Sequence, residues 1–151
     1  MNATVTDLPY NRLIGLESVP GADGPLLRLP GDGSYHNHIG TVSAGALLSL
    51  AEAATGEFLL RRFGTGEGLI PVVRRMEAKF RRPANGSVAG SVAVSPETMA
   101  RFTDELAAKG RALLETPVEL HDETGSLVLS ARVEWFVQRA IVEPDGNRPL
   151  E

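Results

Sequence analysis

The segment from Ile39 to Gly56 constrains the fold more than any other part of this sequence of 151 residues. Every residue in it is apolar, small or hydroxyl-bearing except Glu52. A helix without a polar stripe is normally buried, because a surface helix keeps one polar face toward water. We therefore predict a buried central helix from about Ser43 to Phe63, which ends at the Gly64-Thr65-Gly66 cluster.

Glu52 is the exception in this helix and the first candidate for chemistry. A buried carboxylate must find a hydrogen bond, shift its pKa or face a ligand. No Lys or Arg stands three or four positions from it, where the helix would bring a partner within reach. One interpretation is that Glu52 reaches solvent or a backbone group at a helix edge. The interpretation we favour is that it serves as a general base or a covalent nucleophile.

The predicted start of the helix is made of small residues. Ser43, Ala44 and Gly45 would form its first turn, after a polar loop that contains Asn37 and Gly40. The first amides of a helix have no internal acceptor, and the helix dipole adds positive potential there. The backbone N–H groups of Ala44 and Gly45 could therefore stabilise an oxyanion.

These residues together resemble the signature of a known family. Asn37-x-x-Gly40-x-x-Ser43-Ala44-Gly45, followed by Glu52, resembles the Asn-x-x-Gly-x-x-His-Gly-Gly…Asp/Glu motif of PaaI-like hotdog-fold acyl-CoA thioesterases. Fifteen positions separate Asn37 from Glu52 and nine separate Ser43 from Glu52, as in the family. The sequence departs from the motif at Ser43, where the family has His, and at Ala44, where it usually has Gly.

The resemblance implies a role for each matched residue. Glu52 would activate water or attack the thioester, Asn37 would orient the water or the substrate, and the Ala44 amide would polarise the thioester carbonyl. His38, Gly40 and Ser43 would lie against the substrate. Coenzyme A would enter as part of the substrate, and no cofactor is implied.

The resemblance also implies an assembly, a homodimer or a dimer of dimers. The helix start of one subunit would face Glu52 of the other and its strand near Val73, so that each active site is shared. Four arginines bracket that strand, and a guanidinium binds phosphate in a bidentate manner. Contact with the CoA phosphates is one interpretation of them, and a solvated face paired with Glu77 is the other. These arginines are Arg74, Arg75, Arg81 and Arg82.

The remaining sequence predicts an antiparallel sheet. We expect a first hairpin from strands at 13–19 and 26–29, a strand at 69–73, a second hairpin from 74–82 and 87–94, and long strands at 112–121 and 126–139. In the 74–82 strand, Met76, Ala78 and Phe80 alternate with charged residues, which is typical of a half-buried strand.

A second, amphipathic helix is predicted between 95 and 110. Ser95 is a candidate N-cap, Pro96 suits the first helical position, and Gly110 is a candidate C-cap. Met99, Phe102 and Leu106 form its apolar stripe. The expected fold class is thus α+β, with the antiparallel sheet of the hotdog fold wrapped around the central helix.

The whole chain, 1–151, is expected to form a single domain with a core from about 8 to 139 and a loose tail at 143–151. Zero Cys excludes disulfides and a cysteine nucleophile. The net charge of −4 argues against a nucleic-acid partner. We expect no membrane partner and a cytoplasmic location, because the sequence has neither a signal-peptide pattern nor a long apolar run.

Two other functions stay open at this point. A 3-hydroxyacyl thioester dehydratase or hydratase would use His38 with Glu52, although the glycines match the thioesterase spacing better. A non-catalytic acyl-CoA binding domain would explain the departures at Ser43 and Ala44. We interpret His36 and His38 as loop or pocket residues rather than metal ligands, because a third ligand at suitable spacing is missing.

Overall fold

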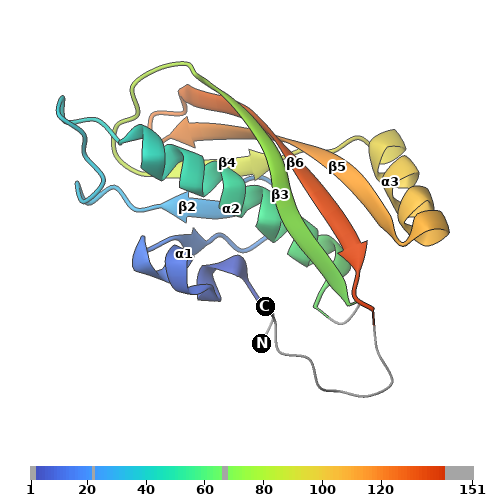
Figure 1. Cartoon of the computed structure of the whole chain (residues 1–151). Coiled ribbons are helices and arrows are strands. Elements are labelled where there is room, and N and C mark those ends of the chain that lie inside the picture. The colour runs from blue at the N-terminus through green and yellow to red at the C-terminus, as the bar shows by residue number, and fades with distance from the viewer. Residues whose placement is uncertain (1–2, 22, 66–67, 142–151) are drawn as a thin grey trace.

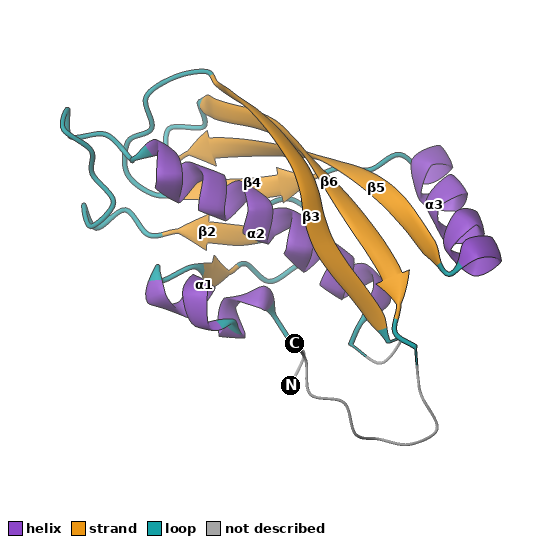
Figure 2. Ribbon diagram, viewed as in Figure 1, coloured by secondary structure: helices purple, strands orange, loops and turns teal. Residues whose placement is uncertain are grey.

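Six antiparallel strands curve around one long helix (Figures 1 and 2). The computed structural model describes residues 3–21, 23–65 and 68–141. The sheet has the order β1-β2-β4-β5-β6-β3. Its strands are β1 (Glu17–Ser18), β2 (Leu27–Leu29), β3 (Leu69–Phe80), β4 (Val88–Val92), β5 (Arg111–Asp122) and β6 (Leu127–Arg139). The tail predicted to be loose, 143–151, lies outside the described residues.

The central helix α2 (Ala44–Phe63) forms where the sequence predicts it. Ser43 is its N-cap, and its side chain accepts a hydrogen bond from the Ala46 amide at 3.4 Å. Gly64 closes the helix with a φ of 68°, a backbone conformation that favours glycine. Burial on all faces, however, is wrong for one chain: Ala44 and Gly45 are exposed, and one flank including Glu52 is only half-buried.

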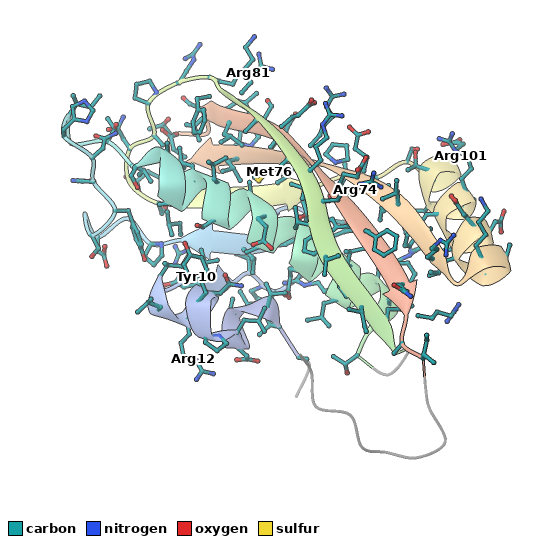
Figure 3. All side chains as sticks on the ribbon, in the orientation of Figure 1. Tyr10, Arg12, Arg74, Met76, Arg81 and Arg101 are labelled. Atoms are coloured by element: carbon teal, nitrogen blue, oxygen red, sulfur yellow. The ribbon has the colours of Figure 1, made fainter. Side chains whose placement is uncertain are left out.

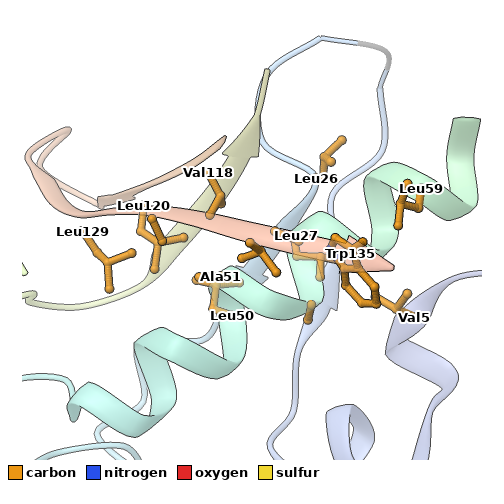
Figure 4. Packing of buried hydrophobic residues seen from close by; sticks show 14 of the residues in the cluster. Val5, Leu26, Leu27, Leu50, Ala51, Leu59, Val118, Leu120, Leu129 and Trp135 are labelled. Carbon is orange, nitrogen blue, oxygen red and sulfur yellow. The ribbon is translucent and has the colours of Figure 1, made fainter. Parts of the chain in front are cut away.

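The hydrophobic core fills the space between α2 and the sheet (Figure 4). Leu50, Ala51 and Ala54 of the helix are fully buried in it. Gly90 of β4 allows the close approach, because an added Cβ would lie 3.1 Å from both Ala54 and Leu120. Along β6, alternate residues from Leu129 to Val137 are buried, and Leu127 is only half-buried.

Strand β3 is an edge of the sheet and departs from three expectations. It pairs with β6 and not with β4, so the hairpin predicted from 74–82 and 87–94 is wrong. The two predicted segments at 69–73 and 74–82 are one strand, with a register shift between Val73 and Arg75. Ten of its twelve residues are exposed, because the sheet stops at this strand and leaves its second edge open. The half-buried face predicted from Met76, Ala78 and Phe80 is therefore wrong for one chain, since only Met76 is half-buried.

The second helix α3 (Pro96–Lys109) confirms its prediction in detail. Ser95 caps it, Pro96 begins it, and Gly110 ends it in the left-handed conformation. Met99, Phe102 and Leu106 are buried. The Phe102 ring meets the Phe63 ring of α2 edge to face, with centroids 5.7 Å apart, so α3 also secures the end of the central helix.

The N-terminal segment differs most from the expectation. Instead of a strand at 13–19, the chain forms a 3₁₀ turn η1 (Val5–Asp7), a short helix α1 (Pro9–Leu13) and only two strand residues in β1. Pro9 at the first helical position is the signal that favours the helix. Val5 is buried, so the core begins before the predicted residue 8.

Among the described residues, no helix combines the length and the apolar character that a membrane crossing requires.

Candidate active site

The start of α2 presents two backbone donors to the surface. Within the helix the amides of Ala44 and Gly45 have no carbonyl partner, since they belong to its first turn. The Ser43 side chain accepts from Ala46 and leaves these two amides free of the cap. Both residues are exposed, and an added Cβ at Gly45 would meet nothing within 4 Å. A substrate oxygen could therefore approach this turn directly.

Asn37 organises the loop that leads to this turn. Its Oδ1 accepts hydrogen bonds from the amides of Ile39 and Thr41, both at 3.1 Å, and its Nδ2 donates to the Thr41 hydroxyl at 2.9 Å. Gly40 has a φ of 78°, which the tight loop requires. The carboxamide oxygen is thus occupied within the loop, and the second N–H of Nδ2 is the group that Asn37 can offer to a substrate.

A cavity of about 320 Å³ joins this loop to the far end of β3. Asn37 and Ala44 line it together with Arg81 and Arg82. Figure 3 shows Arg81 at the loop that follows β3, whereas Arg74 lies beside the middle of the strand. The structure therefore brings two of the predicted arginines to the predicted oxyanion donors, where guanidinium groups can meet an anionic ligand.

Glu52 lies elsewhere, on the wall of a second cavity of about 630 Å³. No described residue lines both cavities. The Glu52 side chain is half-buried, and burial raises the pKa of its carboxyl above the ordinary value of 4.5. Among the described residues, no donor within hydrogen-bond distance offsets that burial. A carboxylate in this setting is a stronger base than one in water.

A second carboxylate on the same helix, Glu57, has the opposite environment. It is 2% exposed, and its Oε2 accepts from the Val5 amide at 2.8 Å and from the Thr4 hydroxyl at 3.1 Å. Its Oε1 accepts from Nε of Arg61 at 3.0 Å. Glu57 is thus fully occupied in holding the N-terminal segment to α2, which leaves Glu52 as the acid on this helix that is available to a ligand.

Trp135 fixes the helix beside Glu52. Its indole N–H donates to the Thr55 hydroxyl at 2.8 Å, and that hydroxyl donates to the Glu52 carbonyl oxygen, also at 2.8 Å. Both Thr55 and Trp135 are buried. The backbone that carries Glu52 is therefore held at a set distance from β6.

The other predicted site residues line neither cavity. Val73, Arg74 and Arg75 lie on the exposed edge strand, and Arg75 pairs with Glu77, as the solvated interpretation expects. Arg74 lies 3.9 Å from Glu134. His38 and Gly40 are exposed in the loop. Within the described residues, no three His, Cys, Asp or Glu side chains are grouped as a metal site would require.

Sequence reasoning missed Glu57, Arg61 and the N-terminal wall of the larger cavity. The spacing of Glu57 and Arg61 at four positions is an ion-pair signal on any predicted helix, and it could have revealed this pair. The contact of Glu57 with Val5 had no such signal, because the two residues are 52 positions apart.

A known family model matches most of this chain. Residues 22–137 match the family model described as "Domain of unknown function (DUF4442)". The chain belongs to this family. No match was found among proteins with a curated description. The PaaI-like branch implied by the motif therefore stays a prediction.

Several solved structures that are similar to this DUF4442 chain are described as thioesterases. A protein of unknown function from Pseudomonas aeruginosa, described as a probable thioesterase, is 29% identical, with a TM-score of 0.76 over 88% of this chain and 89% of its own. A Haemophilus influenzae thioesterase is 15% identical, with a TM-score of 0.67 over 93% and 90%. A Bacillus halodurans protein solved with CoA is 17% identical, with a TM-score of 0.58 over 74% and 65%. The predicted hotdog fold is confirmed.

Proposed function

We propose that this protein hydrolyses acyl-CoA thioesters, with Glu52 as the general base or nucleophile. The observation that carries the proposal is the Glu52 carboxylate itself, half-buried beside a large cavity, with no hydrogen-bond donor among the described residues. The descriptions of the Pseudomonas and Haemophilus proteins as thioesterases, and the CoA in the Bacillus structure, support the same reaction class.

The reaction needs three groups, and the chain supplies a candidate for each. Water gives a proton to Glu52 and adds to the thioester carbonyl carbon, while the Ala44 and Gly45 amides stabilise the oxyanion. The C–S bond then breaks, and the CoA sulfur leaves with the proton. The second Nδ2 N–H of Asn37 orients the water or the substrate, and Arg81 and Arg82 bind the CoA phosphates.

Within one chain these groups lie apart and line different cavities. Ala44 and Glu52 are eight positions apart on the same helix, which at 1.5 Å per residue is about 12 Å along the axis. Reacting groups must approach to about 3–3.5 Å. The gap exceeds what a glutamate side chain spans, so we propose that the oxyanion donors and the carboxylate of each site come from two chains.

The open edge of β3 offers a place for the second chain. All twelve residues of this strand belong to a sheet edge that a soluble protein must pair, cover or charge. We propose that a two-fold-related copy pairs there and sets the helix start of one subunit against Glu52 of the other. Val73 and Arg75 would then lie at the subunit boundary, next to the shared site.

The activity test is release of free thiol from a panel of acyl-CoA esters. The wild type should release thiol, and Glu52→Gln should abolish turnover while the protein stays folded, because the change removes the base and little volume. Near-wild-type hydrolysis by Glu52→Gln would overturn the assignment of Glu52.

The dehydratase alternative is tested with crotonyl-CoA and a 3-hydroxyacyl-CoA, by following the enoyl absorbance. We expect no change in that absorbance, since His38 is exposed in the loop and lines neither cavity. Conversion of either substrate would favour the dehydratase instead. Tight CoA-ester binding without any thiol release would identify a binding domain.

A further inference from the structure

The cavity beside Glu52 is lined by three parts of the chain. The second half of α2 forms one wall, the beginning of β3 and the end of β6 form another, and the N-terminal segment from Ala3 to Asn11 forms the third. The N-terminal segment runs along α2, because the Val5 amide donates to Glu57 and the Tyr10 hydroxyl lies 2.8 Å from the Ser49 hydroxyl. The volume of about 630 Å³ falls within the range of small-molecule sites, about 300–1,000 Å³.

The N-terminal wall is anchored by buried hydrogen bonds. Glu57 accepts from the Val5 amide, and Asn11, itself 5% exposed, donates from Nδ2 to the Val5 carbonyl at 2.9 Å. Both backbone groups of Val5 are thus paired with buried side chains. Anchoring of this kind fixes the shape of the cavity, since the wall cannot move without breaking these bonds.

Gly56 is the part of the cavity wall next to Glu52. It lies four positions after Glu52, on the same face of α2. Glycine inside a helix is unfavourable, so its presence calls for a local reason. A Cβ at Gly56 would lie 3.6 Å from the Trp135 ring and 3.7 Å from Val5 Cγ1, which are ordinary contact distances. Figure 4 shows Val5 and Trp135 side by side at this point.

The charges around the cavity restrict what it can hold. Glu52 and Asp7 line it, and among the described residues no Lys or Arg does. The rest of the lining is predominantly apolar, with Leu59, Phe63 and Trp135 among its larger side chains. An acyl group that ends in a second carboxylate would be repelled and desolvated here, whereas an uncharged apolar chain would be stabilised by burial.

We propose that this cavity binds an uncharged apolar acyl chain of medium or greater length, which lies against Gly56, beside Val5 and Trp135. Gly56 and Leu8 are the positions that determine its length and bulk. This inference rests on the proposed thioester hydrolysis and adds the substrate class. The reacting carbonyl lies at Glu52, the chain extends toward Phe63, and the N-terminal segment closes over it.

The first test measures kcat/KM with acetyl-, hexanoyl-, decanoyl- and succinyl-CoA. The wild type should prefer decanoyl-CoA to acetyl-CoA and should discriminate against succinyl-CoA. Gly56→Ala fits the fold, because the new methyl meets only ordinary contacts. It should lower the ratio of decanoyl to acetyl kcat/KM by about tenfold or more, since one methylene in an apolar pocket changes discrimination by about 10–200-fold. An unchanged ratio would overturn the proposal.

A matched pair of leucine variants tests the N-terminal wall. Leu8 lines the cavity, whereas Leu13, 81% exposed at the end of α1, does not. Leu8→Ala should widen the cavity and shift the preferred chain length, and Leu13→Ala should leave the selectivity profile as in the wild type. Equal shifts in both variants, or none in Leu8→Ala, would contradict the assigned wall.

A binding measurement separates this inference from the proposed function. In the Glu52→Gln background, thermal stabilisation by decanoyl-CoA is compared with that by CoA alone, with and without Gly56→Ala. The acyl chain should add stabilisation that Gly56→Ala removes. Equal stabilisation by CoA and decanoyl-CoA would overturn the acyl site even if hydrolysis is confirmed. Chain-dependent stabilisation of Glu52→Gln, together with no thiol release by the wild type, would support the site and refute the hydrolase.

Discussion

Glu52 and Glu57 lie five positions apart on α2, yet the same change should have opposite consequences at the two sites. Glu57→Gln converts one carboxylate oxygen into an amide donor. If that amide faces Val5, the buried Val5 N–H loses its acceptor, and if it faces Arg61, the charge-assisted bond is lost. Either orientation sets a donor against a donor. The variant should therefore be destabilised.

The size of the stability loss in Glu57→Gln depends on the hydrogen bonds that Arg61 keeps. Removing one member of a buried ion pair costs about 3–5 kcal/mol when the other charge is left without partners. Arg61 is not left so, because its side chain is 28% exposed and also donates to Ser18, Val19, Gly21 and Leu26. We therefore expect a loss of about 2–3 kcal/mol, which in a chain of this size lowers Tm by about 5–10 °C.

Urea and thermal unfolding at neutral pH measure this loss, with Glu52→Gln as the matched control. The Glu52 carboxylate has no donor among the described residues, so its conversion to Gln removes no hydrogen bond. The control should be at least as stable as the wild type. A Glu57→Gln variant within about 0.5 kcal/mol of the wild type, or an equal loss in both variants, would refute the division of roles.

Three further predictions concern the proposed site. Burial raises the pKa of the Glu52 carboxyl above 4.5, so the native state holds this proton to higher pH than the unfolded chain. The stability that proton binding confers is full below pH 4.5 and is lost as pH rises through the pKa of the folded state. Glu52→Gln should therefore match the wild-type Tm at about pH 4 and exceed it at about pH 8, and a constant difference would contradict this. For the same reason, wild-type kcat/KM should rise with pH through a midpoint above 4.5, in a profile measured with a substrate stable over that range. Asn37→Asp keeps the acceptor for the Ile39 and Thr41 amides, and the Thr41 hydroxyl can donate to the new carboxylate in place of accepting from Nδ2. Because the Nδ2 donor is lost, turnover should fall by about ten- to a thousandfold with little change in Tm, and full activity would exclude that donor.

Much of the fold could be predicted from the sequence because its signals are local. The cap at Ser95, Pro96 at the first turn and Gly110 at the end define α3 within a few residues of sequence. The alternation along β6 likewise reports its buried face directly. Strand pairing depends on distant segments instead. Nothing near 74–94 indicates that β6, nearly fifty residues later, takes the place beside β3, and the expected hairpin was wrong for that reason.

The candidate site could likewise be predicted only where its residues are close in sequence. Motif spacing made Glu52, Asn37 and Ala44 candidates because all three lie within one loop and helix. It could not show that Glu52 faces one cavity while Asn37 and Ala44 face another, because the walls come from β3, β6 and the N-terminal segment. Glu57 was overlooked because its burial depends on Val5 and Thr4, which no helical pattern connects to it.

A proline at the first residue of α2 tests the proposed oxyanion donor, because proline has no backbone N–H. Ala44 is the first residue of α2, where proline is tolerated, and Ser43 has a ψ of 147°, which suits a residue before proline. Ala44→Pro should therefore keep the fold and lower kcat by about 10²–10³-fold through loss of one N–H. Ala44→Gly, which keeps that N–H, is the control.

Subunit mixing of Ala44→Pro with Glu52→Gln tests the central claim most directly. Each variant alone should be nearly inactive. If every site takes its amides from one chain and its carboxylate from the other, each mixed dimer has one intact site, and random exchange at equal amounts should restore about one quarter of wild-type activity. Thiol release after verified subunit exchange is the measurement. No recovery in exchanged dimers, or full activity in a wild-type monomer, would contradict the shared site.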